Sequence, residues 1–518
     1  MPFRSPFPDV AVPDVPLTKF VLERAAAHRD KPALVEATTG RTVTHGDLAD
    51  SVPRVAAGLA RRGFGKGDVL SVYCPNLPEY PVAFHGVASL GGIVHPANPL
   101  LTAEELCFQL TDSRARFLVT VPGLSEKART AAASSQVEDV FVIGERSFAE
   151  LLETDDEAPE VSVDPDDVVA LPYSSGTTGF SKGVLLTHRN LVANLCQIEP
   201  HLLAGEDEVA LGVLPFFHIY GLVVVLNYAL RQGATVVTIP RFDLEVVLGA
   251  IEQHRVTHAF VVPPIVLALA RNEAVERYDV SSVDFVMSGA APLSGELEQE
   301  CAARLECVFR QGYGLTEASP VTHMVPHLPG WERPGSVGPP VPNSEVVLVD
   351  PATADAVAAG EPGEVWVRGP HVMKGYLGDA AASAMTVDSE GWLHTGDIGV
   401  ADEDGYLTVV DRLKELIKVK GYQVAPAELE ALLLTHPAVG DAAVVPSPNE
   451  EAGEVPKAFV VLRQECNADE IVAFVAERVA PYKRIRLCEV IEEIPKSASG
   501  KILRRLLVER ERAKVTRV

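Results

Sequence analysis

The feature that most constrains the fold is a regular alternation of short apolar runs and longer amphipathic segments, which begins at Asp167. The runs have the length of strands, and the segments between them have the length and periodicity of helices. Strands and helices alternating in this way predict a doubly wound, mainly parallel sheet with helices on both faces. The predicted strands cover residues 168–171, 209–214, 235–239, 258–262, 285–288 and 307–311. The predicted helices cover residues 190–196, 244–254, 265–270 and 294–303.

The character of the sequence changes twice towards the C-terminus. Near Gly360 it turns to short β-rich runs separated by glycine turns. After Asp411 come predicted strands over 415–419 and 442–445, with a helix over 426–434 that has proline at its first position. We therefore predict a large α/β N-terminal domain with a small β-rich subdomain over residues 1–410, and a small α+β C-terminal domain over 411–518. A hinge would join the two domains.

Charge and hydropathy exclude several kinds of partner. The formal net charge is −26, and a surface this acidic repels nucleic acid and anionic lipid. The longest apolar stretches, near residues 221–230 and 259–270, are too short or too interrupted by proline to cross a bilayer. The N-terminus lacks the apolar core of a signal peptide. We therefore expect a cytoplasmic enzyme, a monomer or homodimer, that neither binds nucleic acid nor inserts into a membrane.

The most informative motif is the stretch 173–183, Tyr-Ser-Ser-Gly-Thr-Thr-Gly-Phe-Ser-Lys-Gly, which directly follows a predicted strand. Glycines permit tight turns whose backbone amides surround phosphate oxygens, and the hydroxyls and the lysine can face the same anion. No Walker A spacing occurs. From composition alone, a flexible polar loop is an equally good interpretation.

A serine hydrolase is a competing interpretation of the same stretch. Residues 179–183 match Gly-x-Ser-x-Gly, the pattern of a nucleophile elbow, with Ser181 as the nucleophile. The elbow requires its serine on a sharp turn at the strand end, whereas Ser181 lies ten residues beyond Leu171. The spacing disfavours the hydrolase.

Four further motifs follow the glycine-rich stretch in a fixed order. They are Gly-Tyr-Gly-Leu-Thr-Glu at 312–317, Trp-Leu-His-Thr-Gly-Asp at 392–397, Asp-Arg-Leu-Lys-Glu-Leu-Ile-Lys at 411–418 and Pro-Lys-Ser-Ala-Ser-Gly-Lys at 495–501. With the stretch 173–183, this series resembles the adenylate-forming superfamily of acyl-CoA synthetases, luciferase and adenylation domains. The resemblance covers essentially the whole chain.

Within that superfamily the chain is most similar to 4-coumarate:CoA ligases. The residues that carry this likeness lie at 216–221, 262–268, 288–293 and 420–426. The resemblance implies an acid–thiol ligase that adenylates a cinnamate- or 4-coumarate-like acid with ATP, then transfers the acyl group to coenzyme A with release of AMP and pyrophosphate. The alternatives are a medium-chain fatty acyl-CoA ligase, or an adenylating enzyme with another acceptor or an unusual acid such as nitrite.

The resemblance also implies roles for individual residues. Glu317 would bind Mg²⁺, and Lys501 would be the catalytic cation. His218 would contact the acyl carboxylate near the thiol tunnel, and Lys414 would be the hinge. The residues implied in ATP binding are Ser174, Ser175, Gly176, Thr177, Thr178, Gly179, Lys182, Gly312, Tyr313, Thr316, Asp397 and Arg412.

Two further sets complete the implied site. The residues implied in binding the acid are Tyr220, Gly221, Gly289, Ala290, Gly312, Pro320 and Val321. The residues implied in contacting coenzyme A or the adenylate are Lys418, Lys420, Gly421, Tyr422 and Gln423. The chain departs from the family at Ser181, where proline is usual, and at Ser319, where many plant coumarate ligases have glycine. The second departure leaves the ring substitution of the acid open.

Overall fold

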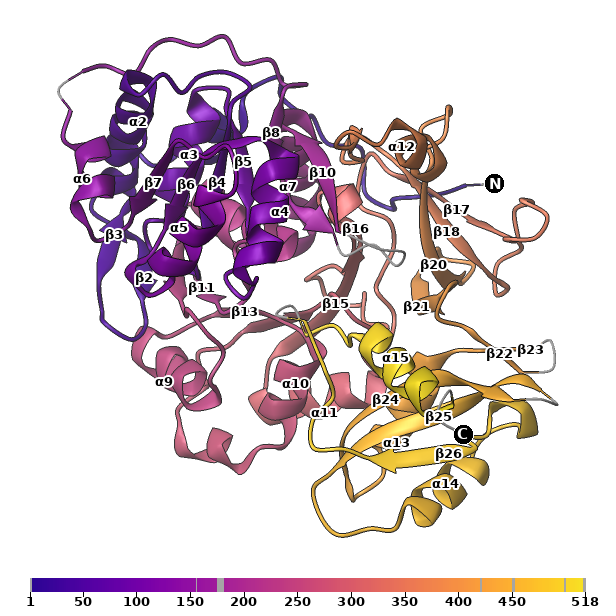
Figure 1. Cartoon of the computed structure of the whole chain (residues 1–518). Helices are drawn as coiled ribbons and strands as arrows, with labels where there is room; N and C mark the ends of the chain where they lie inside the picture. The colour runs from indigo at the N-terminus through magenta and orange to yellow at the C-terminus, as the bar shows by residue number, and fades with distance from the viewer. Residues whose placement is uncertain are drawn as a thin grey trace.

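The computed structural model describes residues 2–154, 156–174, 181–419, 422–449, 452–497 and 500–515. Within these residues the strands form four sheets, two of eight strands and two of five. Figure 1 shows the two large sheets in the N-terminal part, the first small sheet beside them, and the second in a separate C-terminal unit below it. None of the helices in the described part of the chain combines the length and apolar composition that a membrane crossing requires.

The first large sheet has helices on both faces. Leu118 packs with the cluster of α4 and α5, whereas its neighbours Phe117 and Val119 belong to the largest core, with α2 and α3. This is the period of two expected of a strand buried on both sides. The strands, in spatial order, are β19 (Gly375–Tyr376), β10 (Lys182–Thr187), β8 (Val168–Ala170), β5 (Ile93–Pro96), β4 (Val69–Tyr73), β6 (Ala115–Thr120) and β7 (Asp139–Val142), with β9 (Tyr173–Ser174) pairing β10. The helices are α2 (His45–Arg61), α3 (Tyr80–Ser89), α4 (Ala103–Ser113), α5 (Ser125–Ala133) and α6 (Arg146–Leu152).

The second large sheet is parallel except at its two edge strands. In spatial order its strands are β16 (Val321–Met324), β15 (Val308–Gly314), β14 (Phe285–Ser288), β13 (His258–Val261), β11 (Val209–Gly212), β12 (Thr235–Thr238), β2 (Pro32–Glu36) and β3 (Thr42–Thr44). The helices that accompany it are α7 (His188–Leu202), α9 (Leu244–His254), α10 (Pro263–Arg271) and α11 (Gly295–Leu305). The predicted alternation is confirmed, with one difference. Residues 168–171 belong to the first sheet because β8 pairs with β5 and β10.

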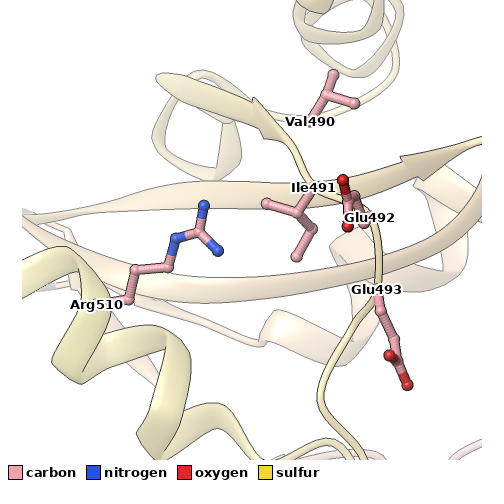
Figure 2. A pocket seen from close by; sticks show the side chains of 5 residues that line it. All are labelled: Val490, Ile491, Glu492, Glu493 and Arg510. Carbon is pink, nitrogen blue, oxygen red and sulfur yellow. The ribbon is translucent and has the colours of Figure 1, made fainter.

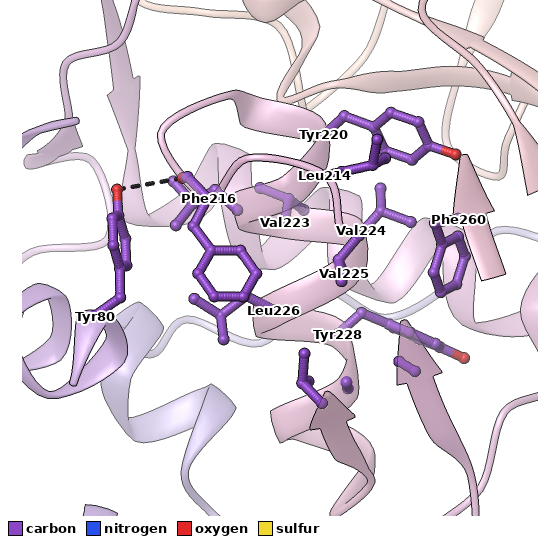
Figure 3. Close-up of a cluster of buried hydrophobic side chains, with 14 of the residues drawn as sticks. Tyr80, Leu214, Phe216, Tyr220, Val223, Val224, Val225, Leu226, Tyr228 and Phe260 are labelled. Atoms are coloured by element: carbon purple, nitrogen blue, oxygen red, sulfur yellow. Dashed lines mark hydrogen bonds between the residues drawn. The ribbon is translucent and has the colours of Figure 1, made fainter. Parts of the chain in front are cut away.

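The segment after β11 is buried between the large sheets. Residues Tyr220–Asn227 form a π-helix that continues into α8 (Tyr228–Gln232), and Leu222 to Leu226 are fully buried. Figure 3 shows this segment with Phe216 beside it, where the Tyr80 hydroxyl donates a hydrogen bond to the Phe216 carbonyl oxygen at 3.2 Å. The sequence identified an apolar stretch here, but not its π-helical form.

The two smaller sheets match the β-rich subdomain and the α+β C-terminal unit. The first contains β1 (Phe3–Arg4), β17 (Glu345–Val349), β18 (Pro362–Arg368), β20 (Leu393–Ala401) and β21 (Leu407–Arg412). The second contains β22 (Ile417–Val419), β23 (Tyr422–Val424), β24 (Val439–Asn449), β25 (Gly453–Leu462) and β26 (Leu487–Val490), with helices α13 (Pro426–Leu434), α14 (Ala468–Ala476) and α15 (Arg504–Val515). The predicted fold class is therefore confirmed, while the exact boundary at residue 411 stays a prediction.

A buried asparagine fixes the loop between β11 and the π-helix. The Asn76 side-chain amide donates to the carbonyl oxygens of Gly212 at 2.9 Å and Leu214 at 2.7 Å, and its oxygen accepts from the Phe216 N–H at 2.8 Å. Gly212 ends β11 and its carbonyl oxygen also accepts from the Ile239 N–H at 3.1 Å, whereas Leu214 and Phe216 lie beyond the strand, so a side chain must satisfy their buried backbone groups. Asn76 thereby fixes the path of the chain towards His218.

We predict that Asn76→Ala lowers the free energy of unfolding by about 3 kcal/mol, because it leaves buried backbone groups without partners. Scanning calorimetry measures this change. Asn98→Ala, which removes a bond to the Leu100 N–H in an exposed loop, is the control and should have little effect. Equal stability of the Asn76 and Asn98 variants would contradict this role.

Candidate active site

Parallel strands bring the 312–317 motif and three of the segments that carry the coumarate-ligase likeness to one edge of the second sheet. β11, β13, β14 and β15 are adjacent and parallel, so the residues that follow them emerge at the same side. Ligand sites of open α/β sheets form at this edge. The segments that meet there are 213–221, 262–264, 289–290 and 312–317.

An aspartate, an arginine and a tyrosine from three strands form a compact polar cluster. Asp397 on β20 lies opposite Arg412 on β21, and its Oδ1 is 3.1 Å from the Arg412 Nε. The Tyr313 hydroxyl donates to the other oxygen of Asp397 at 2.6 Å. Burial and the Asp397 charge hold the pKa of Tyr313 well above its usual value. The cluster thus places a tyrosine ring beside a paired carboxylate.

Lys501 reaches this cluster from the C-terminal unit. Burial lowers the pKa of Lys501 to about 8, with Arg412 as the next cause, while Glu415 and Asp397 oppose the shift. Burial, followed by the charge of Lys501, lowers the pKa of His218 to about 4. Lys501 is therefore close enough to Asp397, Arg412 and His218 to share their electrostatic environment. Within the described residues its ammonium group has no hydrogen bond or ion pair.

The turn before Lys501 packs directly on the large domain. Gly500 has φ of +77°, and a Cβ added there would lie 3.0 Å from Cγ2 of Val262 and 3.4 Å from Cδ of Pro264. A left-handed φ and this close approach both favour glycine. Val262 and Pro264 lie at the carboxyl end of β13. The contact therefore joins the C-terminal unit to the large domain at the end of β13.

Glu317 is held by two hydroxyl groups. The Ser174 Oγ donates to Glu317 Oε1 at 3.0 Å, and the Tyr376 hydroxyl donates to the same oxygen at 2.9 Å. In the described part of the chain, Oε2 of this carboxylate accepts no hydrogen bond. Nearby, Lys182 at the start of β10 forms an ion pair with Asp379 at 3.1 Å. Thr316 precedes Glu317 in the same short 3-10 turn, Thr316–Ala318.

The predicted acid-binding residues surround the tyrosine after His218. The Tyr220 hydroxyl donates to the Met287 carbonyl oxygen at 3.3 Å. A Cβ added at Gly289 would lie 3.1 Å from the Tyr220 ring and 3.5 Å from the Gly312 carbonyl oxygen. Gly221 lies against the Pro215 carbonyl, where a Cβ would clash at 2.1 Å. Ala290 follows Gly289 in the chain, and Pro320 and Val321 lie against Gly314 on β15, where an added Cβ would lie 2.2 Å from the Pro320 carbonyl oxygen.

The coenzyme A residues predicted at positions 418, 422 and 423 do not join this cluster. Lys418, Tyr422 and Gln423 are exposed on the hairpin of β22 and β23, which Figure 1 shows on the outer side of the C-terminal unit. Tyr422 stacks on Tyr482 with ring centroids 4.6 Å apart. Lys414 lies in the turn between β21 and β22. The predicted residues Ser175, Gly176, Thr177, Thr178, Gly179, Lys420 and Gly421 lie outside the described residues.

The surroundings of Ser181 do not form a nucleophile elbow. Ser181 immediately precedes strand β10, so it does not lie between a strand and a following helix. Its hydroxyl accepts a hydrogen bond from the Gln109 amide at 3.4 Å. Both observations agree with the sequence spacing that disfavours a serine hydrolase.

Two hollows on the described surface lie away from the predicted site residues. Figure 2 shows one beside α15, lined by Val490, Ile491, Glu492, Glu493 and Arg510. The second lies near α9 and is lined by Asp243, Leu244, Glu245, Asn272, Glu273, Ala274, Glu276 and Arg277. Neither contains a residue of the five motifs.

Sequence reasoning missed Tyr376, Asp379 and Asn194. The Asn194 side chain donates to the Val321 carbonyl oxygen at 2.8 Å and accepts from the Val321 N–H at 3.1 Å, so it fixes the backbone of Val321, one of the predicted acid-binding residues. These three residues lie far in sequence from the groups they contact, and they follow no local spacing pattern. For Tyr376 the one available signal was its position directly after Gly375. Glycine–tyrosine pairs are common, so this signal does not distinguish a functional tyrosine.

The fold and the converging motifs define a two-part enzyme of the adenylate-forming class. Family models match residues 21–377 as "AMP-binding enzyme" and residues 428–501 as "AMP-binding enzyme C-terminal domain". The chain therefore belongs to the family of AMP-binding enzymes, as the motifs indicated.

Individual relatives span nearly the whole chain. 4-Coumarate–CoA ligase 2 of Oryza sativa subsp. japonica is 46% identical over 98% of this chain and 94% of its own length. The anthranilate CoA ligase AuaEII, solved with anthranoyl-AMP, is 28% identical with a TM-score of 0.89, covering 98% of this chain and 99% of its own. ATP-bound MatB from Rhodopseudomonas palustris is 26% identical with a TM-score of 0.88, covering 96% and 99%.

We predict that Lys501 loses its proton with a midpoint near pH 8, because burial disfavours its charged form. Competitive labelling with acetic anhydride, read by mass spectrometry, measures this midpoint. In the urea-unfolded chain, which serves as control, the midpoint should return to about 10.4. The same midpoint in the folded and unfolded chain would contradict the buried position.

Proposed function

We propose that the protein is an ATP-dependent acid–CoA ligase that adenylates a cinnamate- or 4-coumarate-like acid and transfers the acyl group to coenzyme A. The observation that carries the proposal is the meeting of Lys501 with Asp397, Arg412 and His218 at the strand ends. The likeness to 4-coumarate–CoA ligases over nearly the full chain supports the choice of acid and acceptor.

In the first step a carboxylate oxygen of the acid attacks the α-phosphorus of ATP, and pyrophosphate leaves. Asp397 would accept hydrogen bonds from the ribose hydroxyls, with Arg412 holding the carboxylate in place. Tyr313 would stack on adenine, while Thr316 and the loop at 174–179, with Lys182, would contact the phosphates. Backbone amides and a lysine at such a loop suit phosphate oxygens.

Glu317 has the chemistry of a Mg²⁺ ligand. Its Oε1 is held by two hydroxyl donors, so the carboxylate is oriented, and its Oε2 has no partner among the described residues. The same part of the chain has no group of three or more His, Cys, Asp and Glu arranged for a metal. Mg²⁺ takes few protein ligands and keeps waters and phosphate oxygens. When bound, it would neutralise charge on the phosphates of ATP.

Lys501 would supply positive charge where the attacking carboxylate meets the α-phosphate. Its ammonium has no protein partner among the described residues, so it is free to bind both anions. A preorganised cation in a buried site stabilises developing negative charge more than one in water. Because the acidic chain repels its anionic substrates at long range, this local charge is needed.

The acid would lie against Tyr220, Gly221, Gly289, Ala290, Gly312, Pro320 and Val321, with its carboxylate towards His218 and Lys501. Small residues around the Tyr220 ring favour a flat substrate. His218, whose low pKa keeps it neutral, adds no second positive charge beside Lys501.

In the second step the coenzyme A thiol attacks the acyl carbon, and AMP leaves. The exposed position of Lys418, Tyr422 and Gln423 supports a rotation of the C-terminal unit about Lys414. That rotation would carry them, with Lys420 and Gly421, to the thiol path, as a hinge of few residues allows. A cytoplasmic location and a monomeric or homodimeric state stay predictions.

A panel of acids tests the proposal. With ATP, Mg²⁺ and coenzyme A, cinnamate and 4-coumarate should release AMP faster than octanoate, and release should depend on coenzyme A. Octanoate belongs in the panel because apolar pockets discriminate weakly between such acids. Equal or faster AMP release with octanoate would favour the fatty-acid alternative. Pyrophosphate release without coenzyme A consumption, for example with nitrite, would indicate a different acid or acceptor.

A further inference from the structure

We propose that Tyr376 is a positioning residue with two effects. It orients the Glu317 carboxylate towards the metal, and it keeps Lys182 from pairing with Glu317 before MgATP binds. The inference rests on the proposed function, because it assigns Glu317 to the metal and Lys182 to the phosphates. Tyr376 belongs to none of the five motifs and lies on a strand of two residues, β19.

Tyr376 and its neighbours contact Glu317 twice. The Tyr376 hydroxyl donates to Glu317 Oε1 at 2.9 Å, and the Met373 N–H donates to the Glu317 main-chain carbonyl at 2.8 Å. One contact fixes the backbone of Glu317 and the other its carboxylate. Since Oε1 also accepts from Ser174 and no described residue donates to Oε2, Oε2 is the oxygen that a ligand would use.

The backbone of Tyr376 is itself held in register with the strand that carries Lys182. Tyr376 pairs with Val184 on β10, and the N–H groups of Lys374 and Leu377 donate to the carbonyls of Leu185 at 2.9 Å and Gly183 at 2.8 Å. The Tyr376 N–H donates to the Ser383 Oγ at 2.8 Å. A tyrosine fixed in this way has little freedom to move, so it can orient the groups it touches.

Tyr376 lies between a carboxylate and a cation. Its hydroxyl binds Glu317, while Lys182 Nζ lies 5.2 Å from its ring centroid, within the range of a cation–π interaction. Lys182 is also paired with Asp379, whose other oxygen accepts from the Ala382 N–H at the start of α12 (Ala380–Thr386). These contacts keep Lys182 from forming an ion pair with Glu317. Such a pair would occupy the oxygen that the metal needs.

The test removes only the hydroxyl. Tyr376→Phe should weaken binding of Mn²⁺–ATP, measured by electron paramagnetic resonance, about tenfold, since one charge-assisted hydrogen bond is lost. Binding of ATP in EDTA, measured by calorimetry, should change less than twofold. The thermal unfolding midpoint should stay unchanged. In a Glu317→Gln background, Tyr376→Phe should have no further effect on Mn²⁺–ATP binding.

The matched control is Tyr406→Phe, which removes a hydroxyl that donates to the Trp331 carbonyl oxygen in the β-rich subdomain. It should bind Mn²⁺–ATP like the unchanged chain. The proposal is overturned if Tyr376→Phe binds Mn²⁺–ATP normally, or if the substitution weakens the binding of metal-free ATP to the same extent. It is also overturned if Tyr376→Phe further weakens Mn²⁺–ATP binding in the Glu317→Gln background. Failure of the proposed function gives a different result, because it would appear in the unchanged chain as no AMP formation with any aryl or fatty acid.

Discussion

The contact on which the active site depends is the docking of the Gly500 turn against Val262 and Pro264. It joins the C-terminal unit to the end of β13, the edge where the other motif segments emerge. Arg271 on the large domain adds a second contact, because its guanidinium donates to the Leu434 carbonyl oxygen at 3.2 Å. In this arrangement Lys501 lies in a buried environment beside Asp397 and Arg412. The proposed site therefore combines residues from both parts of the chain, and adenylation would require this arrangement of the two parts.

The linker between the domains is built to support this position. Asp411, at the end of β21, is buried, and its Oδ2 accepts from the Ala427 N–H at 2.9 Å, at the start of α13. Arg504, three residues after Lys501, pairs with Glu415 at 2.7 Å and Glu430 at 2.6 Å. Burial, opposed by Arg504, raises the pKa of Glu430 to about 7. Removing one member of such a buried set is costly, because it leaves a buried charge without a partner. These ion pairs therefore hold Arg504, and with it the segment that carries Lys501, against Glu415 and Glu430.

Much of this could be predicted from the sequence, for identifiable reasons. The strands β11, β13 and β14 are short, mostly apolar runs, and α9 and α13 have the predicted bounds because their periodicity, caps and first-turn proline are local signals. Lys501, Asp397 and Arg412 were predicted from motifs that resemble those of the family, and the structure brings the three residues together. The hydrogen bond from Tyr376 to Glu317 joins residues that lie 59 positions apart in the sequence. The Asn76 side chain binds carbonyl oxygens 136 and 138 positions away. Contacts over such sequence separations leave no local signal in the sequence. These contacts depend on which sheet each strand joins. The sequence pattern grouped the strand at 168–171 with the strands from residue 209 onward, whereas that strand belongs to the first large sheet.

Single-turnover rapid quench of Lys501→Ala tests the central claim most directly. We expect acyl-AMP formation from ATP and cinnamate to slow about a hundred- to thousandfold, the usual effect of removing a preorganised charge. Thioester formation from supplied cinnamoyl-AMP and coenzyme A should change only a few-fold. Lys483→Ala, a surface lysine paired with Glu428, should leave adenylation unchanged. Acyl-AMP formation by Lys501→Ala at the unaltered rate would contradict the account.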